Sequence, residues 1–200
     1  MPTIILLRHG ETISNREGRV QGHADSPLTA RGAAQARSYG RTILSLMGEP
    51  RGWRVVSSPL GRCAQTTGIV CEVAGLDFSA ITFDDRLKEV DAGSFSGMLK
   101  SDLAHRHPEL MGGKGLDHWA FKSPDGESHA ALTARLAQWL AGRAVGERLV
   151  VVSHGIAGKV LRGLYLGQDP AEAMAGDSPQ DAVYLLNGGR AERFACAVTV

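Results

Sequence analysis

The feature that most constrains the fold is the apolar run at residues 3–7, which leads directly into Arg8, His9 and Gly10. Apolar or β-branched residues without a break, closed by glycine, are typical of a strand buried on both faces, as in parallel sheets. In open α/β sheets, ligands bind beyond the carboxyl ends of such strands. We therefore expect Arg8 and His9 at a functional edge. There an arginine can bind phosphate or carboxylate, and a neutral imidazole can attack or accept a proton.

A second strand of this kind is predicted at residues 149–153, and it ends in His154 and Gly155. Residues 53–57 form a shorter strand candidate, and residues 78–83 a weaker one. Helical spacing of apolar residues, with turn residues at the ends, predicts helices between the strands. The expected helices cover residues 29–47, 58–74, 98–107, 128–144 and 156–166, the last of them stopped by Gly167 and Pro170.

The chain closes with two strand candidates, residues 183–186 and 193–200, joined through Asn187-Gly188-Gly189 as a β-hairpin. Strands that alternate with helices predict an α/β fold, here a three-layer α/β/α sandwich with a mostly parallel sheet and an antiparallel edge. Residues 11–27 are too polar for a core and are expected to form a loop over the first strand end. We expect a single domain over residues 1–200, with a lid or insertion at about 98–126.

Composition excludes several classes of function. Lysine and arginine number 22 against 21 acidic residues, which argues against a nucleic-acid or polybasic membrane surface. The first apolar run is too short for a signal peptide, and no stretch reaches transmembrane length. Cys63, Cys71 and Cys196 lack CxxC spacing, so we expect reduced thiols in a cytoplasmic protein. We expect the protein to be a monomer or a homodimer.

Three predicted strands place candidate functional side chains at one edge of the sheet. Neighbouring parallel strands would place His9 and His154 side by side, and the strand at 53–57 leads to Arg62 at the start of its helix. Helix starts favour anions as well. Together, two arginines, two histidines and a helix start supply the charge and the fixed donors that a phosphoryl dianion requires.

These residues resemble the histidine phosphatase superfamily, also called phosphoglycerate mutase-like. The resemblance keeps the family's order from Ile4 to about Leu166, and the combination is far more specific than any single piece. The segments that carry it are Arg8-His9-Gly10-Glu11-Thr12 with Asn15, Ser57-Ser58-Pro59-Leu60-Gly61-Arg62 with Thr66, Leu87-Lys88-Glu89 ahead of Gly93 and Gly97, Gly126-Glu127-Ser128, and Ser153-His154-Gly155.

The resemblance implies that His9 is the nucleophile that becomes phosphohistidine. It implies that Glu89 protonates the leaving oxygen and later activates water. Nearby arginines disfavour a positive imidazole, and a carboxyl group beside a bound dianion retains the proton it must deliver. Because cations neutralise the phosphoryl group, we expect neither a metal nor another cofactor, full activity in a chelator, and inhibition by vanadate. The implied phosphate-binding residues are Arg8, Asn15, Arg62 and His154, and His154 is also counted as catalytic.

The same pocket serves phosphatases, in which water takes the phosphoryl group, and phosphoglycerate mutases, in which a second substrate hydroxyl takes it. The family usually has Trp beside the Asn, and its mutases have Gly-Trp later in the loop; here these places hold Ser14 and Gly22-His23. Phe95 and Ser96 stand where a Trp-Glu pair often follows the acid. Gln21-Gly22 looks like the phosphatase branch, so we favour a phosphatase of small-molecule phosphomonoesters.

A phosphoglycerate mutase and a non-catalytic phospho-ligand binding protein stay as alternatives. The expected partner is a small phosphorylated metabolite, whose alcohol half these motifs do not specify. We expect residues 14–26 and 100–124 to read that half, with Gln21, Gly22 and His23 as candidate substrate contacts.

Overall fold

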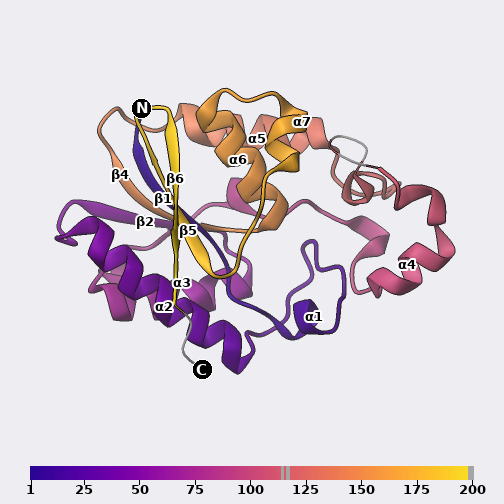
Figure 1. Cartoon of the computed structure of the whole chain (residues 1–200), viewed down its shortest axis with the longest axis horizontal. Coiled ribbons are helices and arrows are strands. Elements are labelled where there is room, and N and C mark those ends of the chain that lie inside the picture. The colour runs from indigo at the N-terminus through magenta and orange to yellow at the C-terminus, as the bar shows by residue number, and fades with distance from the viewer. Residues whose placement is uncertain (114, 116–117, 198–200) are drawn as a thin grey trace.

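The computed structural model describes residues 1–113, 115 and 118–197. Strand β1 (Thr3–Arg8) runs through the middle of the sheet, and the chain then alternates between helices and strands (Figure 1). The other strands are β2 (Trp53–Ser57), β3 (Thr82–Phe83), β4 (Arg148–Ser153), β5 (Ala182–Asn187) and β6 (Arg190–Ala195). The α-helices are α1 (Ile13–Arg16), α2 (Ala30–Met47), α3 (Gly61–Ala74), α4 (Lys100–Arg106), α5 (His129–Ala141), α6 (Gly155–Leu166) and α7 (Pro170–Ala175). The 3₁₀ turns are η1 (Phe78–Ala80), η2 (Asp85–Leu87), η3 (Gly93–Phe95), η4 (Pro108–Leu110) and η6 (Trp119–Phe121).

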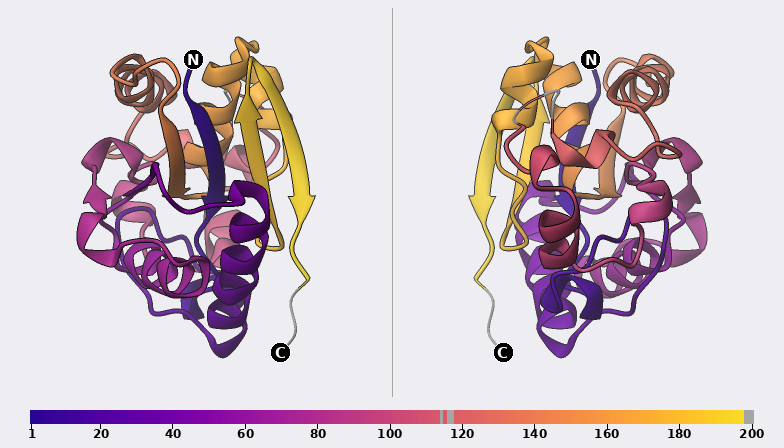
Figure 2. Two further views of the ribbon diagram at one scale, coloured as in Figure 1. Left: turned by 90° about the vertical axis from the view of Figure 1, so that its left-hand side faces the viewer. Right: turned by 90° about the vertical axis from the view of Figure 1, so that its right-hand side faces the viewer.

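In the described part of the chain, six strands form one sheet in the order β3-β2-β4-β1-β5-β6. Strands β3, β2, β4 and β1 are parallel, whereas β5 and β6 are antiparallel and lie at an outer edge in both views of Figure 2. The register pairs Arg8 with Ser153 and Ser57 with Val152, so these strands end at the same sheet edge. The predicted mostly parallel sheet with an antiparallel edge is confirmed.

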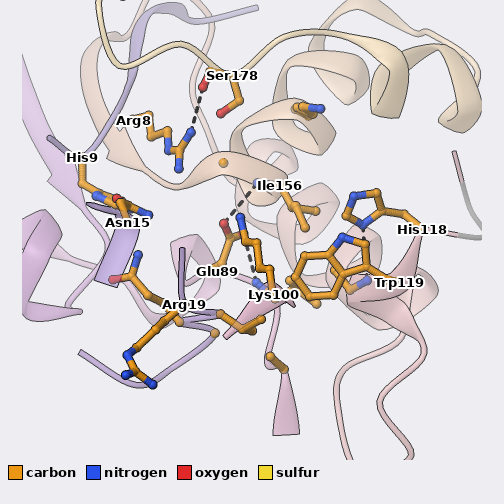
Figure 3. Close-up of a pocket in the computed structure, with 18 of the residues that line it drawn as sticks. Arg8, His9, Asn15, Arg19, Glu89, Lys100, His118, Trp119, Ile156 and Ser178 are labelled. Carbon is orange, nitrogen blue, oxygen red and sulfur yellow. Dashed lines mark hydrogen bonds between the residues drawn. The ribbon is translucent and has the colours of Figure 1, made fainter. Parts of the chain in front are cut away.

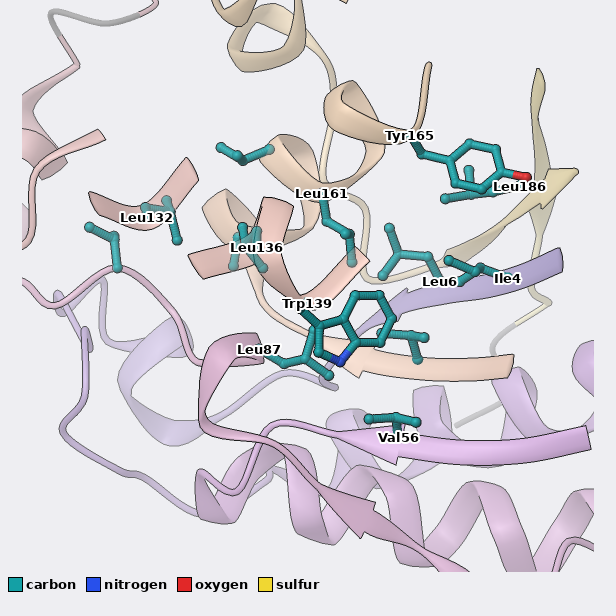
Figure 4. Close-up of a cluster of buried hydrophobic side chains, with 14 of the residues drawn as sticks. Ile4, Leu6, Val56, Leu87, Leu132, Leu136, Trp139, Leu161, Tyr165 and Leu186 are labelled. Carbon is teal, nitrogen blue, oxygen red and sulfur yellow. The ribbon is translucent and has the colours of Figure 1, made fainter. Parts of the chain in front are cut away.

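Both faces of the sheet are covered by helices. Ile5 and Leu7 of β1 belong to a buried cluster with α2 and α3, while Ile4 and Leu6 belong to a second cluster with α5, α6 and α7. This alternation is the two-residue period of a strand. In the second cluster Trp139 is fully buried above the sheet (Figure 4). Burial of a large side chain of this kind contributes about 1.5–3 kcal/mol, so the strands are anchored from both sides and hold their ends in place.

Several predicted boundaries need correction. The loop expected at 11–27 contains the one-turn helix α1, which a capping box between Thr12 and Asn15 stabilises. Helix α3 begins at Gly61 rather than at residue 58, because Pro59 lies in the turn before it. Pro170, read as a stop, instead opens α7 behind the N-cap Asp169; proline suits either place. Strand β6 begins at Arg190, three residues before the predicted start, and residues 198–200 of that prediction lie outside the described residues.

The segment at 98–126 holds α4, η4 and η6, and α4 lies away from the sheet in Figure 1. Its entry is hydrogen-bonded to the loop after β1: Val20 N donates to Met98 O at 2.9 Å and Lys100 N to Gly18 O at 2.9 Å. A small apolar cluster that includes Val20 and Leu103 fixes the two segments together. Its action as a lid stays a prediction. None of the helices among the described residues combines the length and apolar character needed to cross a bilayer.

Candidate active site

A cavity of about 260 Å³ lies beyond the carboxyl ends of β1 and β4 (Figure 3). Arg8 and His9 enter it from the end of β1, and Gly155 and Ile156 from the start of α6 directly after β4. Glu89 comes from the connection that follows η2. The parallel register therefore brings residues that are far apart in sequence to one place, as the sequence predicted.

His9 is held as a neutral imidazole with a defined tautomer. Its side chain is 2% exposed, and Nδ1 lies 2.8 Å from the carbonyl oxygen of Gly10. A carbonyl only accepts, so we assign the proton to Nδ1 and the free lone pair to Nε2. Burial, followed by the charges of Arg8 and Arg62, holds the pKa of His9 well below its usual range. Nε2 is therefore available as a nucleophile at neutral pH.

The turn that carries His9 depends on glycine. A Cβ atom on Gly10 would lie 2.3 Å from the carbonyl oxygen of Gly32, and one on Gly32 would lie 2.0 Å from that of Glu11. The first turn of α2 thus packs directly on the backbone behind His9. Gly10 N also donates to Thr66 Oγ1 at 3.1 Å, which ties the same turn to α3. A side chain at Gly10 or Gly32 would displace the nucleophile.

Arg8 presents an unsatisfied donor. Its Nη1 donates to the carbonyl oxygen of Ser178 at 2.9 Å, but its buried Nε has no hydrogen-bond partner among the described residues. An unpaired buried donor is costly. An anion in the cavity could accept from this guanidinium, since carboxylates and phosphates accept bidentately from arginine.

Arg62 is 1% exposed, and its donors hold the loop that follows α1. Nη1 donates to Ala24 O at 2.9 Å and Nη2 to Gly22 O at 2.7 Å. Asp25, which the sequence did not single out, forms an ion pair with Arg62 at 3.2 Å and accepts from the backbone N–H of Gly61 at the start of α3. Arg62 is thus a cation of the cavity and the anchor of its loop.

His154 lies edge-on to His9, with ring centroids 5.3 Å apart. Its Nδ1 accepts from Arg62 Nε at 3.2 Å, so Nε2 carries the proton and donates to Ser58 Oγ at 2.8 Å. Burial and the charge of Arg62 hold its pKa well below the usual range. His154 does not line the cavity. It positions Arg62 here, and direct contact with a phosphoryl oxygen, which would require Nε2 to leave Ser58, stays a prediction.

Asn15 has its amide fixed by a residue that the sequence did not indicate. Asn15 Oδ1 accepts from Thr12 N at 3.3 Å and from Gln180 Nε2 at 3.2 Å. Because the oxygen is occupied by donors, the amide NH₂ of Asn15 is left for the cavity that this residue lines. Gln180 Nε2 also donates to the carbonyl oxygen of His9 at 3.1 Å, and so it connects the two residues.

Glu89 accepts hydrogen bonds at the start of α6. Oε1 accepts from Val90 N at 3.1 Å and Ala157 N at 2.9 Å, whereas Oε2 accepts from Ile156 N at 3.1 Å. The carboxylate is therefore held at a helix N-terminus, where negative charge is stabilised. Oε2 accepts from fewer donors than Oε1 and keeps a lone pair that a proton can occupy. In Figure 3, Glu89 lies between the end of the cavity marked by His9 and the end marked by Trp119.

Arg135 of α5 supports the backbone that carries Glu89, and sequence reasoning missed it. It binds Glu127 bidentately, with both N–O distances at 2.7 Å. It also donates to the carbonyl oxygens of Arg86, Lys88 and Glu89 at 2.7–3.0 Å. Glu127 belongs to the Gly126-Glu127-Ser128 segment just before α5, so an arginine eight positions later, on that helix, was the available signal.

Of the three candidate substrate contacts, two line the cavity and one does not. Gln21 and Gly22 line the cavity, and Gln21 Oε1 accepts from Thr12 Oγ1 at 3.1 Å. His23 is exposed and does not line it; its Nε2 lies 2.9 Å from Glu89 O and its Nδ1 lies 3.6 Å from Asp91. His23 is placed to hold the Glu89 segment rather than a ligand.

The cavity is strongly cationic. Among the described residues that line it, Glu89 is the acidic one, and Arg8, Arg19, Arg62, Lys100 and Lys159 are cations. No group of three or more His, Cys, Asp and Glu side chains in the described chain is arranged to hold a metal ion. The lining suits an anion, because its positive charge would repel a metal ion.

The chain is similar to known proteins in both sequence and structure. It is 38% identical over 164 residues to the "Probable phosphoglycerate mutase GpmB" of Salmonella arizonae, covering 78% of this chain and 71% of that protein. Its structure is similar to a mycobacterial glucosyl-3-phosphoglycerate phosphatase, with a TM-score of 0.77, 24% identity and 96% coverage of both chains. It is also similar to the alpha-ribazole phosphatase of Shigella flexneri, with a TM-score of 0.75, 23% identity, and coverage of 99% and 98%.

The family comparison covers nearly the whole molecule. The model of the histidine phosphatase superfamily, branch 1, matches residues 4–194, which include every site residue named above. The chain belongs to this superfamily.

Proposed function

We propose that this protein is a metal-independent phosphatase that hydrolyses small phosphomonoesters through a phosphohistidine at Nε2 of His9. The observation that carries the proposal is the buried, neutral His9, whose free lone pair lies in a cavity lined by cations. The cavity, about 260 Å³, lies just below the usual volume of ligand sites, roughly 300–1,000 Å³, so it suits a small metabolite.

In the first step Nε2 of His9 attacks phosphorus, and the bond between phosphorus and the alcohol oxygen breaks. The alcohol oxygen takes its proton from Oε2 of Glu89 as it leaves. In the second step Glu89 removes a proton from water, whose oxygen attacks phosphorus. The P–N bond then breaks, its electron pair returns to Nε2, and inorganic phosphate is released.

Arg8, Arg62 and the amide of Asn15 would bind the non-bridging oxygens during both steps. Arg8 has a buried donor without a partner, and Asn15 has its NH₂ left for the cavity. Donors that are already fixed stabilise the charge of the transition state without reorganisation. These cations take the place that a metal ion would otherwise have, and we expect full activity in the presence of a chelator.

Hydrolysis is separated from the mutase alternative by the fate of the phosphoryl group. The relative named as a probable phosphoglycerate mutase favours transfer, whereas the solved structures named above are phosphatases. Incubation with 3-phosphoglycerate, followed by phosphorus NMR, measures both outcomes together. We expect inorganic phosphate. Formation of 2-phosphoglycerate without inorganic phosphate would establish the mutase instead.

A substrate panel headed by p-nitrophenyl phosphate, assayed with and without a chelator, tests the proposal itself. The wild-type protein should release phosphate equally in both conditions, and His9→Asn should release none. Hydrolysis that disappears on chelation and returns with zinc would contradict the metal-independent route. Binding of phosphate without any turnover would indicate a phospho-ligand binding protein.

A further inference from the structure

The loop between α7 and β5, residues 176–181, contacts the end of β1. Its Ser178 carbonyl oxygen accepts from Arg8 Nη1 at 2.9 Å, the contact drawn as a dashed line in Figure 3. Gln180 of the same loop donates to the carbonyl oxygen of His9 at 3.1 Å. The positions of two neighbouring active-site residues therefore depend on where this loop lies.

The bond to Ser178 decides which donors of Arg8 are left for a ligand. A guanidinium holds its five N–H donors in one fixed plane. With Nη1 bonded to Ser178, the fork formed by Nε and Nη2 remains, and the buried Nε has no partner among the described residues. Two parallel N–H donors match two oxygens of a phosphoryl group. The Ser178 carbonyl thus selects the edge of Arg8 that can bind phosphate.

Arg162 of α6 holds this loop by its backbone. Its Nη2 donates to the carbonyl oxygen of Asp177, the residue directly before Ser178, at 2.9 Å and lies 3.4 Å from the Asp177 carboxylate. The guanidinium also lies over the Tyr184 ring, with Cζ 4.1 Å from the ring centroid, and the side chain is 11% exposed. Stacking and bonding together fix the plane of a guanidinium, so Arg162 fixes the backbone that presents the Ser178 carbonyl.

Gly176 makes room for Arg162. A Cβ atom at this position would lie 2.5 Å from Arg162 Nη2 and 3.2 Å from the carbonyl oxygen of Ala173. The backbone of Gly176 is extended, with φ −62° and ψ 161°, a conformation that every residue type adopts. The turn itself therefore does not require glycine. The close approach of the guanidinium does require it.

We infer that Arg162 is a positioning residue for phosphoryl binding: it holds the Ser178 carbonyl against Arg8, so that the Nε and Nη2 donors of Arg8 are left for the substrate. The inference rests on the proposed function for the identity of the ligand. Arg162 does not line the active-site cavity, so it acts through the loop and does not touch the substrate.

The test compares two arginines that share one acidic partner. Arg162→Met should lower kcat/KM for p-nitrophenyl phosphate and weaken inhibition by vanadate, each by about tenfold, the effect of one hydrogen bond to a charged group. Arg193 also pairs with the Asp177 carboxylate, at 3.4 Å, but makes no bond to the loop backbone in the described structure, and both side chains are about half exposed. Arg193→Met should therefore change both quantities by less than about twofold. Equal losses in the two variants would overturn the inference, because the charge around Asp177 would then be responsible.

Gly176→Ala provides a second variant that keeps every charge. The new methyl group would displace the end of the Arg162 side chain, so kcat/KM should fall as it does in Arg162→Met while the protein stays folded. A normal kcat/KM per folded molecule in both variants, with only a lower Tm, would show that Arg162 supports the fold and does not position Arg8.

Nitrogen-15 NMR of the arginine side chains observes Arg8 directly. Its Nε–H signal, assigned by its absence from Arg8→Lys, should shift when inorganic phosphate is added to the wild-type protein. In Arg162→Met this signal should already differ in the free protein and should shift less with phosphate. Identical Arg8 signals in the two proteins, free and with phosphate, would refute the positioning role. If p-nitrophenyl phosphate is not hydrolysed at all, the phosphatase function fails, and this NMR comparison still decides whether Arg162 positions Arg8.

Discussion

Arg135→Gln tests whether the segment that carries Glu89 is held by one partly buried arginine. The change removes a bidentate ion pair with Glu127 and the donors to the carbonyl oxygens of Arg86, Lys88 and Glu89. Arg135 and Glu127 are 19% and 15% exposed. Breaking a fully buried pair costs about 3–5 kcal/mol, which partial exposure reduces to about 2–4 kcal/mol here. For a chain of this length that lowers Tm by roughly 4–16 °C.

The matched control is Arg54→Gln. Arg54 pairs with Glu147 at 2.8 Å, a similar distance, but its side chain is 61% exposed. Such a pair contributes about 0–1 kcal/mol. Urea unfolding and thermal melting of both variants measure the difference. Folded Arg135→Gln should also lose more kcat on an alkyl phosphate, which needs a proton from Glu89, than on p-nitrophenyl phosphate. Equal stability of the two variants would refute a supporting role for Arg135, and equal loss of kcat on both substrates would show that Glu89 is not what it positions.

Further predictions concern the proton, the amide and pH. Glu89→Gln should lower kcat on alkyl phosphates by about a hundredfold or more with little change in affinity, and unchanged turnover would move the acid role elsewhere. Gln180→Leu should lower kcat/KM by about tenfold. Because Gln180 orients the Asn15 amide, Gln180→Leu made in the Asn15→Ala background should cost little more, and a fully additive loss would show that Gln180 acts through its bond to the His9 carbonyl oxygen instead. The depressed pKa of His9 and His154 means that the unfolded chain binds more protons than the native chain below about pH 6.5, so each histidine should lower the free energy of unfolding by about 1.4 kcal/mol per pH unit as the solution is acidified. Urea titrations across pH 5–7 measure that slope, which should fall by about 1.4 kcal/mol per pH unit in His9→Gln and would not change in that variant if His9 were charged in the native state.

The sequence was informative wherever a local pattern decided the structure. The apolar runs before His9 and His154 predict buried neighbouring strands, and the N-cap at Thr29 predicts where α2 begins. Proline was ambiguous, since Pro170 opens a helix instead of ending one. The two-residue strand β3 is too short to leave a period in the sequence.

Side-chain contacts over long sequence separations could not be predicted in the same way. Asp25 binds Arg62 across 37 positions, and Gln180 binds Asn15 across 165. Nothing in the local sequence of Asp25 or Gln180 distinguishes them from solvated loop residues. His154 was expected at the sheet edge and lies there, but its bonds to Arg62 and Ser58 depend on how α3 packs against β4.

The most direct test of the central claim is the identification of the covalent intermediate. In Glu89→Gln, p-nitrophenol can leave without a proton, whereas the second step lacks its base, so the phosphoenzyme should accumulate after a single burst. Alkaline quenching and peptide mass spectrometry should then find one phosphoryl group on His9, labile to acid and absent from His9→Asn. A phosphoryl group on another residue, or turnover without any covalent intermediate, would contradict the account.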